Sequence, residues 1–155
     1  MGCNDAVKYI LDTHVLDWAR SADPRLSPKV RELLEAAVPG ELAISDVTLS
    51  ELARHLAMGR IRVDMSPERW LEAAAAGLVV LPVTPAIAIR AATLDWENRD
   101  PCDRHIVATA VEHRLPLLTI DEKIHALGMR EVGHHVTRGE SRHGELAGDA
   151  RECFL

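Results

Sequence analysis

The chain has 155 residues, 47% of them hydrophobic, which suits one globular domain with its own core. Its formal net charge of −6 argues against a broad basic surface for nucleic acid, although a cluster of metal-binding acids would also make the charge negative. Three cysteines without a CxxC spacing argue against a disulfide framework or a zinc–cysteine site. No apolar stretch reaches the ~18 residues of a membrane span and no secretory signal opens the chain, so we expect a cytoplasmic protein.

Short strand-like segments alternate with helical segments along the chain. Apolar and β-branched residues predict strands at 8–11, 41–45, 78–83 and 115–120. Helical patterns predict helices at 27–40, 46–58, 66–77, 84–94 and 102–114, and a short helix from Asp121. This alternation is typical of an α/β fold whose mostly parallel sheet is covered by helices on both faces.

Capping residues mark where the predicted helices begin. Ser27, Ser66 and Thr84 each stand directly before a proline, which is the preferred order at a helix start, and Asp46 is predicted to cap the helix at 46–58. Glycines end two of the helical segments, at Gly40 and Gly77, where they favour termination.

The C-terminal part of the chain has a different character. We assign residues 1–138 to one domain and residues 139–155 to a polar, weakly ordered tail, because the tail carries glycines and has no clear period. The segment 130–136 is predicted as a last edge strand. A metal role for its His134 and His135 is disfavoured, since adjacent residues of a strand point to opposite faces.

Two acidic residues directly follow predicted strands. Ligands of open parallel α/β sheets bind beyond the carboxyl ends of the strands, and Asp12 and Asp121 stand at such ends. Capping of the helix that follows explains either acid equally well when it is considered alone. The pattern becomes informative only if other acids lie nearby.

Asp103 and Glu51 are further candidates, on helices. Asp103 shares the apolar stripe of its helix with Val107 and Ala110, and a carboxylate buried there needs a partner or a metal. Pairing with Arg104 or Arg99 is the structural alternative. Glu51 lies nearly opposite the apolar stripe of its own helix, which fits a solvated face or a face turned to a cleft, and the pattern does not decide between them.

Other catalytic motifs are missing from the sequence. It contains no GxGxxG or GxxxxGK[ST] segment, which argues against dinucleotide and P-loop sites, and no GxSxG segment. Cys102 is an unsuitable nucleophile, because the adjacent Asp103 raises the pKa of its thiol.

Four segments resemble a known family. YILDTHVLDW, DVTLSELARH, DPCDRHIVATA and LLTIDEKI, in this order and spacing, are similar to the motifs of PIN domains in VapC-type toxins. These are the ribonuclease components of bacterial type II toxin–antitoxin modules. The resemblance covers about residues 8–127, and DPCDRHIVATA is its most specific part. It implies a three-layer α/β/α sandwich on a mostly parallel sheet of four to five strands.

The resemblance also implies a site and its chemistry. The function would be metal-dependent endoribonuclease activity with Mg²⁺ or Mn²⁺, restrained by a cognate antitoxin protein, in a homodimer without membrane contact. By motif, the acids would be Asp12, Glu51, Asp103 and Asp121, with the metal held by Asp12, Asp103 and Asp121. Glu51 would then face the cleft. Supporting roles would fall to Thr13, Asp100, Arg104, Thr119 and Glu122.

The chain departs from the family pattern at three places. Asp17 stands where an apolar residue is usual, and its helical position predicts an exposed side chain that alters a dimer or antitoxin surface. Glu122 lies beside Asp121 and is an alternative ligand. The tail beyond about residue 136 has no counterpart in the family.

Two other functions are compatible with clustered acids. The first is a catalytically silent PIN-like module that binds RNA or protein, since fold alone does not fix function. The second is a receiver-like phosphoacceptor domain, for which Lys123 lies near the expected position. The DPCDRHIVATA segment has no place in a receiver, and the full set of four acids favours the nuclease.

Overall fold

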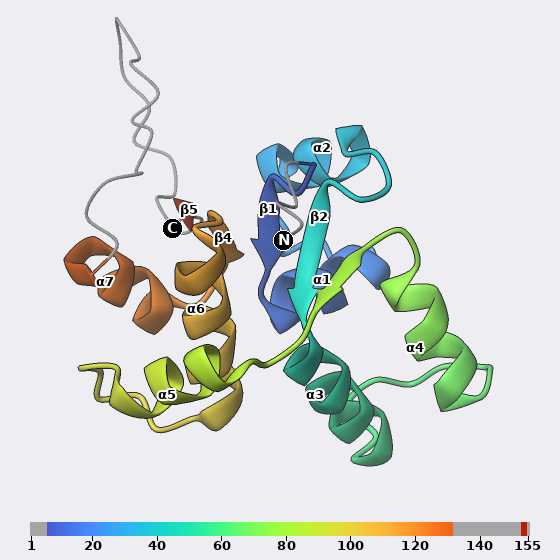
Figure 1. The fold of residues 1–155 in the computed structure, drawn as a ribbon. Helices are drawn as coiled ribbons and strands as arrows, with labels where there is room; N and C mark the ends of the chain where they lie inside the picture. The colour runs from blue at the N-terminus through green and yellow to red at the C-terminus, as the bar shows by residue number, and fades with distance from the viewer. Residues whose placement is uncertain (1–5, 132–152, 155) are drawn as a thin grey trace, which may run out of the picture.

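A five-stranded sheet forms the centre of the molecule. The computed structural model describes residues 6–131 and 153–154 (Figure 1). The strands lie in the order β3-β2-β1-β4-β5. Their bounds are Tyr9–Leu11 for β1, Leu42–Ser45 for β2, Val79–Leu81 for β3, Leu117–Thr119 for β4 and Cys153–Phe154 for β5. The first four run parallel, and β5 pairs antiparallel with β4. The predicted mostly parallel sheet is confirmed.

Seven helices connect the strands in the described part of the chain. They are α1 (Thr13–Arg20), α2 (Pro28–Ala36), α3 (Asp46–Ala57), α4 (Pro67–Ala75), α5 (Pro85–Thr93), α6 (Pro101–His113) and α7 (Glu122–Glu131). The predicted helices are all present, with ends that differ by a few residues. The largest difference is in α2, which ends at Ala36, before the Pro39–Gly40 pair.

Alternating strand residues build two cores, one on each face of the sheet. Ile10 packs on one face with residues of α6 and α7, such as Ile106 and Ile124. The next residue, Leu11, packs on the other face with residues of α1 and α2, such as Leu16 and Val30. This alternation follows from the two-residue period of a strand and produces the three-layer arrangement. A small cluster also joins α5 to α6, which lie side by side (Figure 1).

Three of the four predicted N-caps are confirmed. The hydroxyls of Ser27, Ser66 and Thr84 each accept a hydrogen bond from the backbone N–H three residues on. The prediction for Asp46 is wrong, because Ser45 is the N-cap residue of α3. The Asp46 carboxylate instead accepts a hydrogen bond from the backbone N–H of Val83, at 3.0 Å, and so joins α3 to the segment that follows β3.

The predicted edge strand at 130–136 is wrong at its start. Arg130 and Glu131 are the last residues of α7, whose Ile124 and Leu127 pack into the core at helical spacing and continue the helix past the expected boundary. The rest of the segment, with His134 and His135, lies outside the described residues, as does the tail apart from β5. Within the described ranges, no helix has the length and apolar character needed to cross a membrane.

Candidate active site

Asp12 stands at the carboxyl end of β1 and is almost fully buried, with 1% of its surface exposed. The neighbouring strand β4 supplies Thr119, whose hydroxyl donates a hydrogen bond to Oδ2 of Asp12 at 2.9 Å. Oδ1 of Asp12 is also buried but has no hydrogen-bond partner. An unpaired buried carboxylate oxygen is costly, so this atom marks a place where a donor or a cation belongs.

Burial dominates the electrostatics of Asp12. It raises the pKa of the carboxyl group from 3.8 to about 6, and the negative charge of Asp103 adds to the rise. His14 and the hydrogen bond from Thr119 act in the opposite direction. The protein therefore stabilises the carboxylate form of Asp12 less than water does. A bound cation would stabilise that form.

Asp103 lies in the first turn of α6, half-buried. The side-chain amide of Asn98 donates a hydrogen bond to its Oδ2 at 2.7 Å. Burial raises the pKa of Asp103, the Asn98 amide lowers it, and repulsion from Asp100, Asp121 and Glu51 raises it again. Asp103 therefore interacts electrostatically with all the other acids, since it also raises the pKa of Asp12.

Glu51 lies on α3 and is 5% exposed. The side of α3 that lies opposite the apolar stripe is therefore turned to the protein interior at Glu51, and not to the solvent. Oε1 of Glu51 lies 3.7 Å from Nη2 of Arg54, a half-exposed side chain one turn on. Oε2 is buried without a hydrogen-bond partner, as Oδ1 of Asp12 is. Two carboxylates of the candidate site thus each present one unpaired oxygen.

Asp121 follows β4 and caps α7. Its Oδ1 accepts a hydrogen bond from the backbone N–H of Lys123 at 2.7 Å, at the start of α7. Its own backbone N–H donates to the Thr119 hydroxyl at 3.0 Å. Thr119 therefore connects Asp121 to Asp12. Glu122, the alternative ligand, is exposed.

The other supporting residues have structural contacts. The hydroxyl of Thr13 donates to that of Thr48 at 3.5 Å and links α1 to α3, while the backbone N–H of Thr13 supports the Asp12 carboxylate. Asp100 caps α6 by accepting the backbone N–H of Cys102 at 2.9 Å. Burial and the nearby acids raise the pKa of the Cys102 thiol, in line with the expectation that it is a poor nucleophile.

Arg104 bonds to backbone carbonyls and not to Asp103. Its guanidinium donates four hydrogen bonds, of 2.7 to 2.9 Å, to the carbonyl oxygens of Ala91, Leu94, Trp96 and Asn98. It therefore holds the end of α5 and the connection to α6 in place. Through Asn98, this connection also positions the amide that bonds to Asp103.

Several residues at the site were not foreseen from the sequence. Asn98 has no periodic signal, because it lies in an irregular segment, although an amide two residues before the DPCDR run is a reasonable candidate for bonding to that run. His14 and His55 lie with their ring centroids 6.3 Å apart, between α1 and α3. Asp17, predicted to be exposed, is half-buried and close enough to both histidines to interact with them electrostatically.

The donor set suits a hard divalent cation. Carboxylate oxygens are the ligands that Mg²⁺ and Mn²⁺ prefer, and two of these oxygens lack a partner. Among residues 6–131 and 153–154, no three acidic, histidine or cysteine side chains already lie close enough together to hold one ion. The four acids therefore do not form a ready-made metal cluster in this structure.

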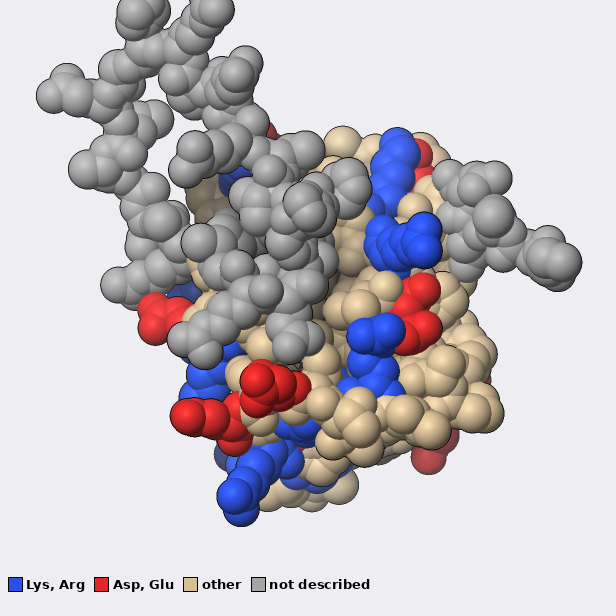
Figure 2. All heavy atoms as spheres, turned by 60° about the vertical axis from the view of Figure 1, so that its left-hand side comes forward, with Lys and Arg blue, Asp and Glu red and all other residues tan. Residues whose placement is uncertain are grey.

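The surface beyond the acids carries mixed charge. On the face shown in Figure 2, lysine and arginine side chains are interspersed with aspartate and glutamate outside the grey residues. This agrees with the net charge of −6.

The raised pKa of Asp12 predicts how stability depends on pH. Because the pKa of Asp12 is higher in the folded state, the folded protein binds this proton more tightly than the unfolded chain does. The free energy of unfolding therefore falls as pH rises from about 4 to about 6. The full loss is about 3 kcal/mol, at about 1.4 kcal/mol per pKa unit, and about 2 kcal/mol of it falls between pH 4.5 and 7.5. In chelator, Asp12→Asn should lack this loss, so its stability relative to the parent should rise over that range. Urea unfolding from pH 4.5 to 7.5 measures the difference, and parallel curves for the two proteins would contradict the prediction.

Comparisons with known proteins identify a family and a shared fold. The model of the PIN domain matches residues 9–128. Ribonuclease VapC22 of Mycobacterium tuberculosis is 34% identical over 116 residues, which cover 74% of this chain and 88% of that protein. A toxin–antitoxin complex from Klebsiella pneumoniae contains a chain that is 26% identical with a TM-score of 0.58, over 77% of this chain and 91% of that chain. FitAcB from Neisseria gonorrhoeae is 21% identical with a TM-score of 0.58, over 78% and 93%, which shows a shared fold.

Proposed function

The chain belongs to the PIN-domain family, and from its acidic site we propose that it is a metal-dependent endoribonuclease, the toxin of a toxin–antitoxin pair. The named ribonuclease among its relatives and the solved toxin–antitoxin complex support the substrate class and the biological setting. RNA is then the substrate, and cleavage is hydrolysis of a phosphodiester bond.

One observation carries the proposal most directly. Asp12 is buried at the end of β1 with an unpaired Oδ1, while Glu51 presents an unpaired Oε2 from α3. A helix cap bonds its oxygen to the backbone N–H two or three residues on, and Asp12 makes no such bond to α1. Carboxylates that are buried, mutually repelling and incompletely bonded are characteristic of functional sites.

Each residue of the site then has a distinct task. Asp12, Asp103 and Asp121 would hold Mg²⁺ or Mn²⁺, which supplies Lewis-acid chemistry and offsets the negative charge of the phosphodiester. Thr119 fixes the rotamer of Asp12, and Asn98 fixes that of Asp103. The unpaired oxygen of Glu51 can accept a proton from the attacking water.

Cleavage of RNA tests the proposal. Purified protein is incubated with total RNA in Mg²⁺, in Mn²⁺ and in excess chelator, and the ends of the products are mapped by sequencing. We expect defined internal cuts in the presence of metal and intact RNA in chelator. Cleavage that persists in chelator contradicts the metal site, and intact RNA in all three conditions favours a silent binding module.

Thermal stability separates a metal site from a set of helix caps. In chelator, Asp103→Asn should melt no lower than the parent, because the substitution removes repulsion among the acids. In Mn²⁺ at 100-fold excess over its Kd, the parent should gain ~2.7 kcal/mol, and Asp103→Asn should lose most of this gain. Paired melts in chelator and in Mn²⁺ measure both effects.

Thr84 provides the matched control for these melts. It caps α5 outside the acidic site, so Thr84→Ala should cost about 1 kcal/mol with or without metal. If Asp103→Asn behaves in the same way, and the parent shows no shift with metal, Asp103 is an ordinary group at a helix start.

An antitoxin partner is the remaining part of the proposal. The resemblance implies a small protein encoded beside this one, and an arginine fork on it would match the acidic site. Expression of the chain alone should arrest growth, and co-expression with the neighbouring gene product should restore growth and yield a stable complex. Size-exclusion chromatography with light scattering then reports whether the chain itself is the expected homodimer. Normal growth with the chain alone, together with no co-purifying neighbour, would contradict this part.

A further inference from the structure

A flat cationic surface lies in the loop between α1 and α2. The guanidinium of Arg25 stacks on the ring of Trp18, with its central carbon 4.3 Å from the ring centroid. Trp18 is half-buried and packs against the core formed by α1 and α2. The Arg25 side chain is 66% exposed, so the face of the guanidinium that points away from Trp18 is open to solvent.

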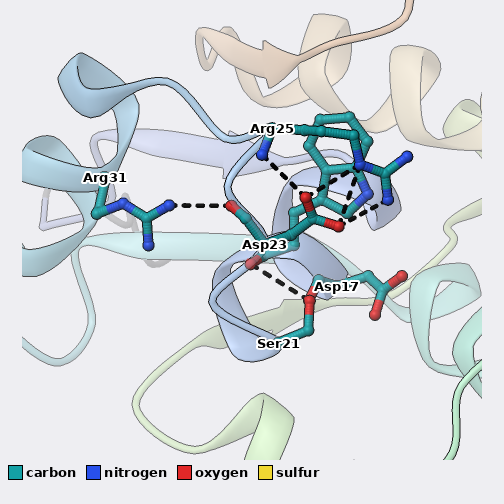
Figure 3. Close-up of polar contacts among 6 residues, drawn as sticks. Asp17, Ser21, Asp23, Arg25 and Arg31 are labelled. Atoms are coloured by element: carbon teal, nitrogen blue, oxygen red, sulfur yellow. Dashed lines mark hydrogen bonds and ion pairs between the residues drawn. The ribbon is translucent and has the colours of Figure 1, made fainter.

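Asp23 holds this guanidinium in a fixed plane. Its Oδ1 accepts from Nε of Arg25 at 3.0 Å and its Oδ2 accepts from Nη2 at 2.6 Å. Oδ1 also accepts the backbone N–H of Arg25 at 2.9 Å, and Arg31 donates to the Asp23 carbonyl at 2.9 Å (Figure 3). The orientation of Arg25 is therefore set before any ligand arrives.

The contact with Asp23 also decides what kind of ligand suits Arg25. Hydrogen bonds from Arg25 lower the pKa of Asp23 to about 2, so the carboxylate stays charged and offsets the charge of the guanidinium. A paired guanidinium has less to offer a phosphate, but its open face still stacks on a flat ring. Arginine planes of this kind stack on the unpaired bases of single-stranded RNA.

One face of α1 connects this surface to the acidic site. His14, Asp17 and Trp18 are spaced three and four residues apart, so they are neighbours on that face. His14 acts electrostatically on Asp12, and Asp17 interacts with both His14 and Arg25. Trp18 follows Asp12 by six residues, or about 9 Å of helix rise. A strand of about three stacked nucleotides covers that distance, at ~3.4 Å each.

We propose that Arg25, stacked on Trp18 and held by Asp23, is a platform for one base of the RNA substrate, a few nucleotides from the bond that is cut. The proposal rests on the proposed nuclease function. A metal held by the acids offsets the negative charge at the scissile phosphate alone, so contacts elsewhere have to add affinity for the rest of the RNA. A preorganised stacking platform provides such a contact without adding net charge.

Kinetics on a short oligoribonucleotide that contains a mapped cut site test the platform. Arg25→Ala should raise KM by roughly 5- to 150-fold, the range expected for loss of one base–aromatic stack, with kcat unchanged within about twofold. Arg25→Lys keeps the positive charge but removes the planar guanidinium, so its KM should rise as much as that of Arg25→Ala. Arg90→Ala is the matched control, since Arg90 is also a surface arginine paired with a carboxylate, that of Glu112, and it should leave KM unchanged.

An abasic scan of the oligonucleotide makes the test specific. In the parent, removal of one base should raise KM as much as Arg25→Ala does, and in Arg25→Ala the same abasic position should have no further effect. Additive losses would overturn the platform, and so would an unchanged KM in Arg25→Ala. Normal cleavage by Arg25→Ala, combined with lost inhibition by the antitoxin, would overturn it as well and assign the surface to the protein partner.

The platform can be tested even if the parent cuts no RNA. Fluorescence anisotropy in chelator measures the affinity for a panel of labelled single-stranded oligonucleotides and their abasic forms. Binding that depends on both Arg25 and one base supports the platform while the nuclease function fails. An affinity that is unchanged in Arg25→Ala, or no binding at all, overturns the platform.

Discussion

Asp12→Asn should abolish RNA cleavage and leave the fold intact. The substitution keeps the size of the side chain and an oxygen that can accept the Thr119 hydroxyl, so packing at the end of β1 is preserved. It removes the negative charge at the most buried acid of the site. A metal ion supplies several kcal/mol of stabilisation to the transition state, and loss of ~4 kcal/mol lowers the rate about 10³-fold.

The measurement compares initial rates of cleavage for the parent and the variant in Mn²⁺. Asp64→Asn is the control, because Asp64 is an exposed acid in the connection between α3 and α4. It should cleave at the parental rate. Thr119→Val should fall between them, about 10- to 100-fold slower, since it removes the hydroxyl that bonds to Oδ2 of Asp12. Native circular dichroism and full activity in Asp12→Asn would place catalysis elsewhere.

The parts of the fold set by local pattern were predictable from the sequence. Strand positions and helix starts follow from short-range signals, and Ser27, Ser66 and Thr84 were correctly predicted as caps. Asp46 was wrongly predicted as a cap, because its carboxylate bonds to a backbone N–H that is 37 residues away in sequence. No pattern within one helix contains that information.

The candidate site likewise contains residues that a local pattern identifies and residues that depend on long-range packing. Asp12 and Asp121 were identifiable because the carboxyl ends of parallel strands meet at one edge of a sheet. Periodicity left Glu51 ambiguous, because a polar helix face fits both solvent and a polar cleft. The packing of α3 in the structure shows that Glu51 is buried. Asn98 was not predicted at all, since its position depends on how an irregular segment is held.

That segment depends on Arg104, whose loss should be the most destabilising single change outside the core. Arg104→Met keeps much of the side-chain volume but removes the donors to four carbonyl oxygens. A hydrogen bond to a charged group contributes ~1.5–3 kcal/mol, and four bonds from one side chain are far from additive. The side chain is only half-buried, so water replaces part of the loss. We expect a decrease of about 3 kcal/mol in the free energy of unfolding.

The expected loss can be distinguished from a simple charge effect. Arg99 is an exposed arginine in the same connection, and Arg99→Met should change stability by less than about 0.5 kcal/mol. Arg104→Lys should recover little, because one ammonium group cannot reach carbonyls as widely spaced as those of Ala91 and Asn98. Well below its melting temperature, Arg104→Met should also cleave RNA more slowly, because the released Asn98 no longer holds Asp103. Urea unfolding and cleavage rates at low temperature measure the two effects. Parental stability in Arg104→Met would show that the segment from Leu94 to Asn98 is held by other contacts.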